Sequence, residues 1–248
     1  MHYTLDDFTN FLRTVDLNSY REQFSKIKTV EMDLPRNIQA LDSIYRIYWN
    51  NDYTLSGSIP TYDEYYELYY KSCEENIKTF WANTGFEMDC QCFPKGLKAR
   101  IYRTWASLIT QIHAGYVAES VFGNGSVEQS TDLDHKDIDI LAHYKGRDIK
   151  IQIKKESHRP EIGRMHKGMS AIEKEGIFNI WYVVPNPNEY LYDPYYKVKA
   201  RKGELRDSLK SFIKYNPEEG TLDRLDNGFV IFTQKEFILI KEAIDSEN

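Results

Sequence analysis

The chain has 248 residues, about one and a half times the usual length of a domain, which is enough to bury a large core. Hydrophobic residues make up 41%, charged residues 28%, and the net charge is -6, so the composition excludes a disordered or collagen-like chain. No run approaches the roughly 20 apolar residues that cross a bilayer, and the N-terminus MHYTLDDFTN lacks the features of a secretory signal, so we expect a cytoplasmic protein with no membrane partner.

The first 95 residues have helical patterns and many aromatic side chains. Apolar residues recur at three- and four-residue spacing from Leu5 to Val15, and Thr4 is placed to cap this helix with Asp7. Further helical patterns cover residues 41–48 and 62–81, and the tyrosines of YDEYYELYY are expected to face the core. We expect residues 1–95 to form a helical region packed on a core of residues 96–248, the two together forming one compact domain.

Residues 96–248 have the pattern of an α/β core. The segment 97–122 predicts a long buried helix that ends at Gly123. Strands are expected at 126–130, 136–144 and 148–156, and a buried strand at 177–185, with a basic segment between the last two that we expect to be helical. GFVIFT predicts another strand, and KEFILIKEAI predicts a closing helix. The resulting order is αβββαβ after a helical N-terminal region, and this order supports a specific active-site geometry.

Two neighbouring strands carry acidic, amide and basic side chains. In KDIDILAHY, alternation places Asp137 and Asp139 on the face opposite the isoleucines. In DIKIQIKKE, Gln152 and Lys154 share a polar face while the isoleucines form an apolar one. Because the tight turn at 145–147 joins the strands, both polar faces can line one side of the sheet. The pattern is Asp139, twelve intervening residues, and then Gln152-x-Lys154.

This pattern suits hydrolysis of a phosphodiester bond. A carboxylate, an amide oxygen and the main-chain carbonyl of Ile153 are ligands that a hard divalent cation prefers. Such a cation lowers the pKa of bound water, and Lys154 adds positive charge near the scissile phosphate. Asp137 and, on the preceding helix, Glu119 are further candidate ligands of Mg²⁺, for which Mn²⁺ can substitute. No zinc, nucleotide-binding or α/β-hydrolase motif competes with this interpretation.

Basic residues are concentrated in two segments in spite of the negative net charge. Residues 145–174 contain nine Lys and Arg against four Asp and Glu, and residues 195–214 contain seven against two. Such asymmetry favours one surface that binds a polyanion, although clustering on solvated helices explains it equally well. The candidate contacts to DNA phosphates or guanine edges are Arg159, Arg164, His166, Lys167, Lys197, Lys199, Arg201 and Lys202.

Longer blocks carry a resemblance to a known family. KIKTVEMDLPR (Lys26 to Arg36), GLKARIYRTWASLITQIHAGY (Gly96 to Tyr116) and QIKKES (Gln152 to Ser157) resemble the TaqI family of type II restriction endonucleases over roughly the first 160 residues. The resemblance implies an α/β fold with a PD-(D/E)xK nuclease-like αβββαβ core and a helical N-terminal region. It also implies a magnesium-dependent enzyme that cuts double-stranded DNA at the palindrome TCGA, between T and C. It also implies a cognate DNA methyltransferase, and a palindromic site implies a homodimer on DNA.

The resemblance also suggests site residues. The acidic positions of the family fall on Asp134 and Asp139, and its basic motif falls on Gln152, Lys154 and Lys155. Strand alternation favours Lys154 as the catalytic lysine and leaves Lys155 as a candidate DNA contact. Gln152 replaces the acidic residue of the general nuclease pattern, so the site has one negative charge fewer to hold the metal.

The residues by themselves leave two other functions open. One is a repair or recombination nuclease with the same core and a structure-selective substrate. The other is a DNA-binding module whose carboxylates are structural and which cleaves nothing. Incubation of unmethylated plasmid with magnesium separates the three functions. Discrete bands indicate a restriction enzyme, structure-dependent nicking indicates a repair nuclease, and retention without cleavage indicates a binding module.

Overall fold

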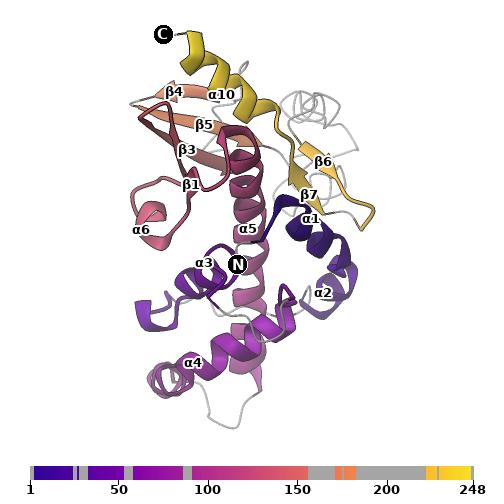
Figure 1. Ribbon diagram of the computed structural model, residues 1–248. Coiled ribbons are helices and arrows are strands. Elements are labelled where there is room, and N and C mark those ends of the chain that lie inside the picture. The colour runs from indigo at the N-terminus through magenta and orange to yellow at the C-terminus, as the bar shows by residue number, and fades with distance from the viewer. Residues whose placement is uncertain are drawn as a thin grey trace, which may run out of the picture. The chain divides into compact units, whose positions relative to one another are not determined.

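The computed structural model describes residues 3–24, 27, 33–52, 58–85, 91–155, 171–174, 176–182, 222–227 and 229–246 (Figure 1). The chain divides into two compact units. The helical unit comprises residues 1–116, 129–136 and 225–229, and the sheet unit comprises residues 117–128, 137–224 and 230–248. The division into residues 1–95 and 96–248 expected from the sequence stays a prediction.

The helical unit is built from amphipathic helices. They are α1 (Leu5–Thr14), α2 (Leu17–Phe24), the 3₁₀ helix η1 (Arg36–Ile38), α3 (Leu41–Tyr48), α4 (Tyr62–Ala82), the short α6 (Thr131–Asp134) and most of α5 (Cys92–Phe122). The expected cap of α1 is confirmed, because the Thr4 hydroxyl accepts the Asp7 N–H at 3.1 Å and the Asp7 carboxylate accepts the Thr4 N–H at 3.0 Å. α4 begins with the same box, formed by Thr61 and Glu64.

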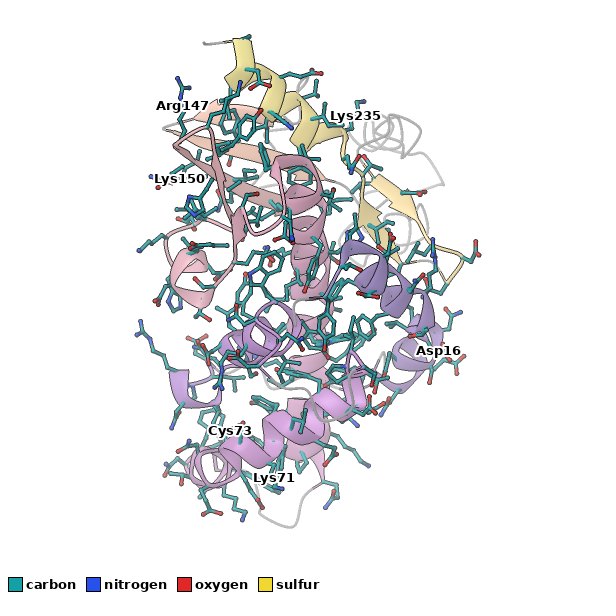
Figure 2. The ribbon with its side chains drawn as sticks, viewed as in Figure 1. Asp16, Lys71, Cys73, Arg147, Lys150 and Lys235 are labelled. Atoms are coloured by element: carbon teal, nitrogen blue, oxygen red, sulfur yellow. The ribbon has the colours of Figure 1, made fainter. Side chains whose placement is uncertain are left out.

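The tyrosines of α4 form the core of the helical unit, as their spacing predicts. Tyr62, Tyr65 and Tyr69 are each at most 2% exposed. Their hydroxyls are bonded as burial requires: the Tyr69 hydroxyl donates to the Ile38 carbonyl at 2.6 Å. Figure 2 shows Cys73 further along α4 with Lys71 beside it, and Cys73 is a buried free thiol. The aromatic side chains of α4 are thus part of the packed core of this unit.

Asn227 joins a distant turn to the end of α1 within the helical unit. Its Nδ2 donates to the carbonyls of Leu12, Arg13 and Val15 at 2.7, 3.2 and 2.9 Å, and its Oδ1 accepts the Phe229 N–H at 3.0 Å. The last carbonyls of a helix have no partner within the helix. One amide therefore satisfies several of them across more than 200 residues of sequence.

The sheet unit contains a five-stranded mixed sheet of order β1-β2-β3-β5-β4. β3 and β5 run parallel, and the other neighbours are antiparallel. The five strands are β1 (Val127–Glu128), β2 (Ile140–Tyr144), β3 (Arg147–Lys155), β4 (Ala171–Lys174) and β5 (Ile177–Tyr182). A two-stranded sheet, β6 (Leu222–Arg224) and β7 (Val230–Phe232), and the helix α10 (Lys235–Ser246) complete the described elements. The protein is therefore of the mixed α/β class.

The five-stranded sheet has one apolar face and one polar face. Ile140 pairs with Ile151 and Ile153 pairs with Ile180, and all four side chains are at most 5% exposed. The last turn of α5 lies against this apolar face, where the rings of Phe122 and Tyr144 are 5.8 Å apart. Figure 1 shows α10 running beside β4 and β5. The opposite face carries the polar side chains of β2 and β3.

The β2–β3 hairpin differs from the expected one at its start. The turn is as predicted, with Lys145 at φ 50° and Gly146 at φ 75°, the left-handed pair that a two-residue hairpin needs. β3 matches its expected range within one residue, but β2 begins at Ile140 and not at residue 136. Asp137 has φ 59°, so it lies in a turn, and the expected alternation of Asp137 with Asp139 is wrong. The helix expected between the strands 148–156 and 177–185 is wrong for residues 171–174, which form β4 because they pair antiparallel with β5. The short helix α6 was not expected either.

Candidate active site

Asp139 is fixed at the point where β2 begins. Its backbone N–H donates to the Ile151 carbonyl at 3.0 Å, and its Oδ2 accepts the Ile153 N–H at 2.6 Å. The side chain is 6% exposed. The carboxylate thus takes the place of a main-chain acceptor at the end of the β2–β3 ladder, and a charged acceptor makes this hydrogen bond a strong one. This contact holds the acidic group beside the strand segment that carries Gln152.

Gln152 lies on the polar face of β3, as the sequence predicts. Ile151 and Ile153 on either side of it are buried on the other face, whereas Gln152 is half-buried. On β5 its register partner is Asn179. The Asp139 carboxylate is bonded to the N–H of Ile153, the residue that follows Gln152. The structure therefore brings Asp139 and Gln152 together.

Asn179 is a further candidate for the site, and the sequence interpretation did not include it. It is 7% exposed, its Nδ2 donates to the Ile177 carbonyl at 3.1 Å, and its Oδ1 has no hydrogen-bond partner in the part of the chain that the structure describes. Most buried polar atoms are hydrogen-bonded, so this oxygen has the capacity to accept a further hydrogen bond. The available signal was the single amide inside the apolar run IFNIWYVVP.

The two candidate lysines continue β3. Lys154 pairs with Trp181 of β5, and Lys155 pairs with Tyr182. The side chains of both lysines lie outside what the structure describes. The choice of Lys154 as the catalytic lysine stays a prediction from strand periodicity.

The remaining acidic candidates occupy three different settings. Glu119, which is 8% exposed, accepts the Gly125 N–H through Oε1 at 2.8 Å, so this carboxylate supports the loop that follows α5. Asp137 is exposed in the turn before Asp139. Asp134 is half-buried at the end of α6, in the helical unit. Their proposed role as metal ligands stays a prediction.

The donors near Asp139 are oxygen atoms, and they suit a hard cation. Within the described residues, no three His, Cys, Asp or Glu side chains are grouped so that they can hold a metal ion. A site at Asp139 therefore needs amide or carbonyl oxygens and water beside its carboxylate, as Mg²⁺ sites commonly use. The amide of Gln152 is available on this face. The residues present fit Mg²⁺ better than Zn²⁺.

A histidine between two carboxylates lies on the same polar face. His143 Nδ1 is 2.8 Å from Asp148 Oδ1, and its Nε2 is 3.2 Å from Glu128 Oε1. The hydrogen bond to Asp148 is the main reason that the pKa of His143 is raised, and the bond to Glu128 acts in the same direction. Figure 2 shows Lys150 on the neighbouring strand, where it is exposed. The sequence interpretation assigned no role to this group.

All the candidate DNA-binding residues except Lys155 lie outside the described residues. This applies to Arg159, Arg164, His166, Lys167, Lys197, Lys199, Arg201 and Lys202. Within the part that the structure describes, no helix is long and apolar enough to cross a membrane.

Comparison with known proteins places the molecule among the restriction endonucleases. The family model for the TaqI restriction endonuclease matches residues 5–244, so the chain belongs to this family. It is 30% identical over 233 residues to the type II restriction enzyme TaqI of Thermus aquaticus, covering 93% of this chain and 84% of the relative. It is 31% identical over 238 residues to the type II restriction enzyme TthHB8I of Thermus thermophilus. No solved structure is significantly similar to this one. The protein is a site-specific restriction endonuclease.

Proposed function

We propose that this restriction endonuclease cleaves double-stranded DNA at the palindrome TCGA, between T and C, with Mg²⁺ as its cofactor and Mn²⁺ as a substitute. Membership of the TaqI family across residues 5–244 supports the target sequence. The observation that carries the chemistry is the buried Asp139 carboxylate, bonded to the Ile153 N–H beside Gln152. A buried carboxylate next to an unpaired amide on a polar sheet face is a suitable place to bind a hard cation.

We further propose that the sheet unit contains a PD-(D/E)xK-type core. The β2–β3 hairpin, followed by β5 parallel to β3, supports this arrangement, because both candidate ligands then lie on neighbouring strands. In our proposal residues 96–248 form the catalytic core and residues 1–95 form its helical extension.

The proposed chemistry divides the work among few residues. Asp139 and Gln152 hold the cation, and Asp134, Asp137 and Glu119 are further candidates for binding it or its waters. When bound, the cation lowers the pKa of water and stabilises the negative charge that develops on the phosphate. Lys154 adds positive charge at the scissile phosphate and orients the nucleophile.

The proposed partners follow from a palindromic target. Two copies of the chain related by a two-fold axis match the symmetry of TCGA, so we propose a homodimer on DNA. Phosphate contacts come from Lys155 and from the basic segments around residues 159–167 and 197–202. The genetic partner is a DNA methyltransferase that protects the same sites in the cytoplasm of the host.

Digestion of a plasmid of known sequence tests this proposal. With Mg²⁺, unmethylated plasmid is expected to give discrete fragments whose mapped ends lie between T and C of TCGA. A plasmid methylated at TCGA and a reaction with excess chelator are the controls, and both are expected to stay uncut. Undiminished cleavage in chelator contradicts the metal requirement. Nicking that follows DNA structure, or DNA binding without cleavage, contradicts the proposed function.

A further inference from the structure

Two side-chain amides are neighbours on the polar face of the sheet unit. Gln152 of β3 is the register partner of Asn179 of β5, and the two strands run parallel. Adjacent strands lie about 4.8 Å apart, and paired residues project to the same face. The neighbouring pair, Ile153 and Ile180, is buried on the opposite face, which agrees with this placement.

Both amides have unused hydrogen-bonding capacity. Asn179 is anchored through Nδ2 to the Ile177 carbonyl, while its buried Oδ1 has no partner among the residues that the structure describes. Gln152 is half-buried, and its side chain makes no hydrogen bond to the described residues. One buried acceptor thus lies next to one amide that has two N–H donors.

The orientation of Gln152 matters because an amide has two different ends. Its oxygen attracts a cation, whereas its NH₂ group carries partial positive charge and repels one. A half-turn about the last side-chain torsion exchanges the two ends, and that torsion is soft. Without a cation, the Asp139 carboxylate attracts the NH₂ end of the amide, so a partner on β5 is needed to turn the oxygen toward Asp139.

We propose that Asn179 is a positioning residue for Gln152. Oδ1 is unpartnered in the structure, and in this proposal a rotation of the Gln152 side chain brings an amide N–H to it. The Nδ2 bond to the Ile177 carbonyl keeps Oδ1 in place. The Gln152 oxygen is thereby turned away from β5 and toward Asp139, on the β2 side of β3. This inference rests on the proposed role of Gln152 in holding the cation, and it explains how an amide serves where the general nuclease pattern has a carboxylate.

A double-mutant cycle tests whether Asn179 acts through Gln152. Asn179→Leu is expected to lower the single-turnover cleavage rate on a TCGA duplex by about 10- to 100-fold, a typical effect of removing a partner that orients a metal ligand. Asn179→Thr keeps a side-chain oxygen and is expected to retain a higher rate. In a Gln152→Leu background, Asn179→Leu is expected to have about no further effect, because two residues that act as a unit are not additive. Should Asn179→Leu fail to fold, Asn179→Ala takes its place in the same cycle.

A second measurement needs no metal and no DNA. The side-chain NH₂ resonances of Gln152 are assigned by their loss in Gln152→Leu, and they are expected to shift in Asn179→Leu. The inference is overturned if the rate losses of Asn179→Leu and Gln152→Leu multiply in the double mutant, or if the Gln152 resonances are unchanged in Asn179→Leu. Either result leaves the proposed function intact. A normal rate for Gln152→Leu overturns the role of Gln152 and this inference together. Failure of the unmodified enzyme to cut TCGA contradicts the proposed function itself.

Discussion

Substitutions of Asp139 separate its catalytic charge from its structural hydrogen bond. Asp139→Asn keeps a side-chain oxygen that can accept the Ile153 N–H, now 2.6 Å from Oδ2, while it removes the negative charge. Asp139→Ala removes both. The charge is proposed to anchor the cation, and interactions of this kind are worth on the order of 3 kcal/mol in the transition state, or at least about a hundredfold in rate. Both variants are therefore expected to lose at least this factor.

The two variants should differ in stability. Asp139 is 6% exposed, so Asp139→Ala leaves the Ile153 N–H buried without its acceptor. An unsatisfied buried donor costs about 1–3 kcal/mol, a penalty that Asp139→Asn largely avoids. Urea unfolding gives the stability difference, and single-turnover cleavage of a TCGA duplex gives the rates. An active Asp139→Asn enzyme would refute the proposed role of the charge. Equal stability of the two variants would refute the structural role of the hydrogen bond.

Four further predictions concern other parts of the chain. Lys154→Ala should slow single-turnover cleavage about a hundredfold or more, and Lys155→Ala should slow it less. A larger loss of rate in Lys155→Ala than in Lys154→Ala would show that the strand register is off by one. Arg164→Ala, if it removes a phosphate contact, should weaken binding to all DNA sequences and reduce the slope of affinity against salt, and an unchanged slope would place the DNA elsewhere. Asn227→Asp turns an oxygen toward three carbonyls and should lower the free energy of unfolding by about 2 kcal/mol, whereas an unchanged urea midpoint would show that the bonds to α1 contribute nothing. Burial lowers the pKa of His113 to about 3, so the unfolded chain binds more protons and stability should fall as pH decreases below about 6.5. At about pH 4.5 this loss is roughly 3 kcal/mol, and urea titrations of a His113→Gln variant should show a smaller loss if the assignment is correct.

Local patterns in the sequence determined most of the elements. The capping box at Thr4, the helical spacing of the tyrosines in α4 and the Lys145–Gly146 turn each depend on residues a few positions apart. Alternation along β3 identified Gln152 as part of a polar face for the same reason. Together with the resemblance to the TaqI family, these local signals were enough to predict the class of enzyme, which the family match confirms.

The tertiary structure decided what local periodicity cannot express. Asp139 directly precedes β2, and its carboxylate bonds to β3, because the turn at Asp137 breaks the alternation expected from residue 136. Asn179 becomes a neighbour of Gln152 only when β5 pairs in parallel with β3, and that register is set by long-range strand pairing. Asn227 reaches the end of α1 across more than 200 residues. Hydrogen bonds and register between distant segments depend on how the chain returns on itself, and a single sequence carries only a weak signal of that path.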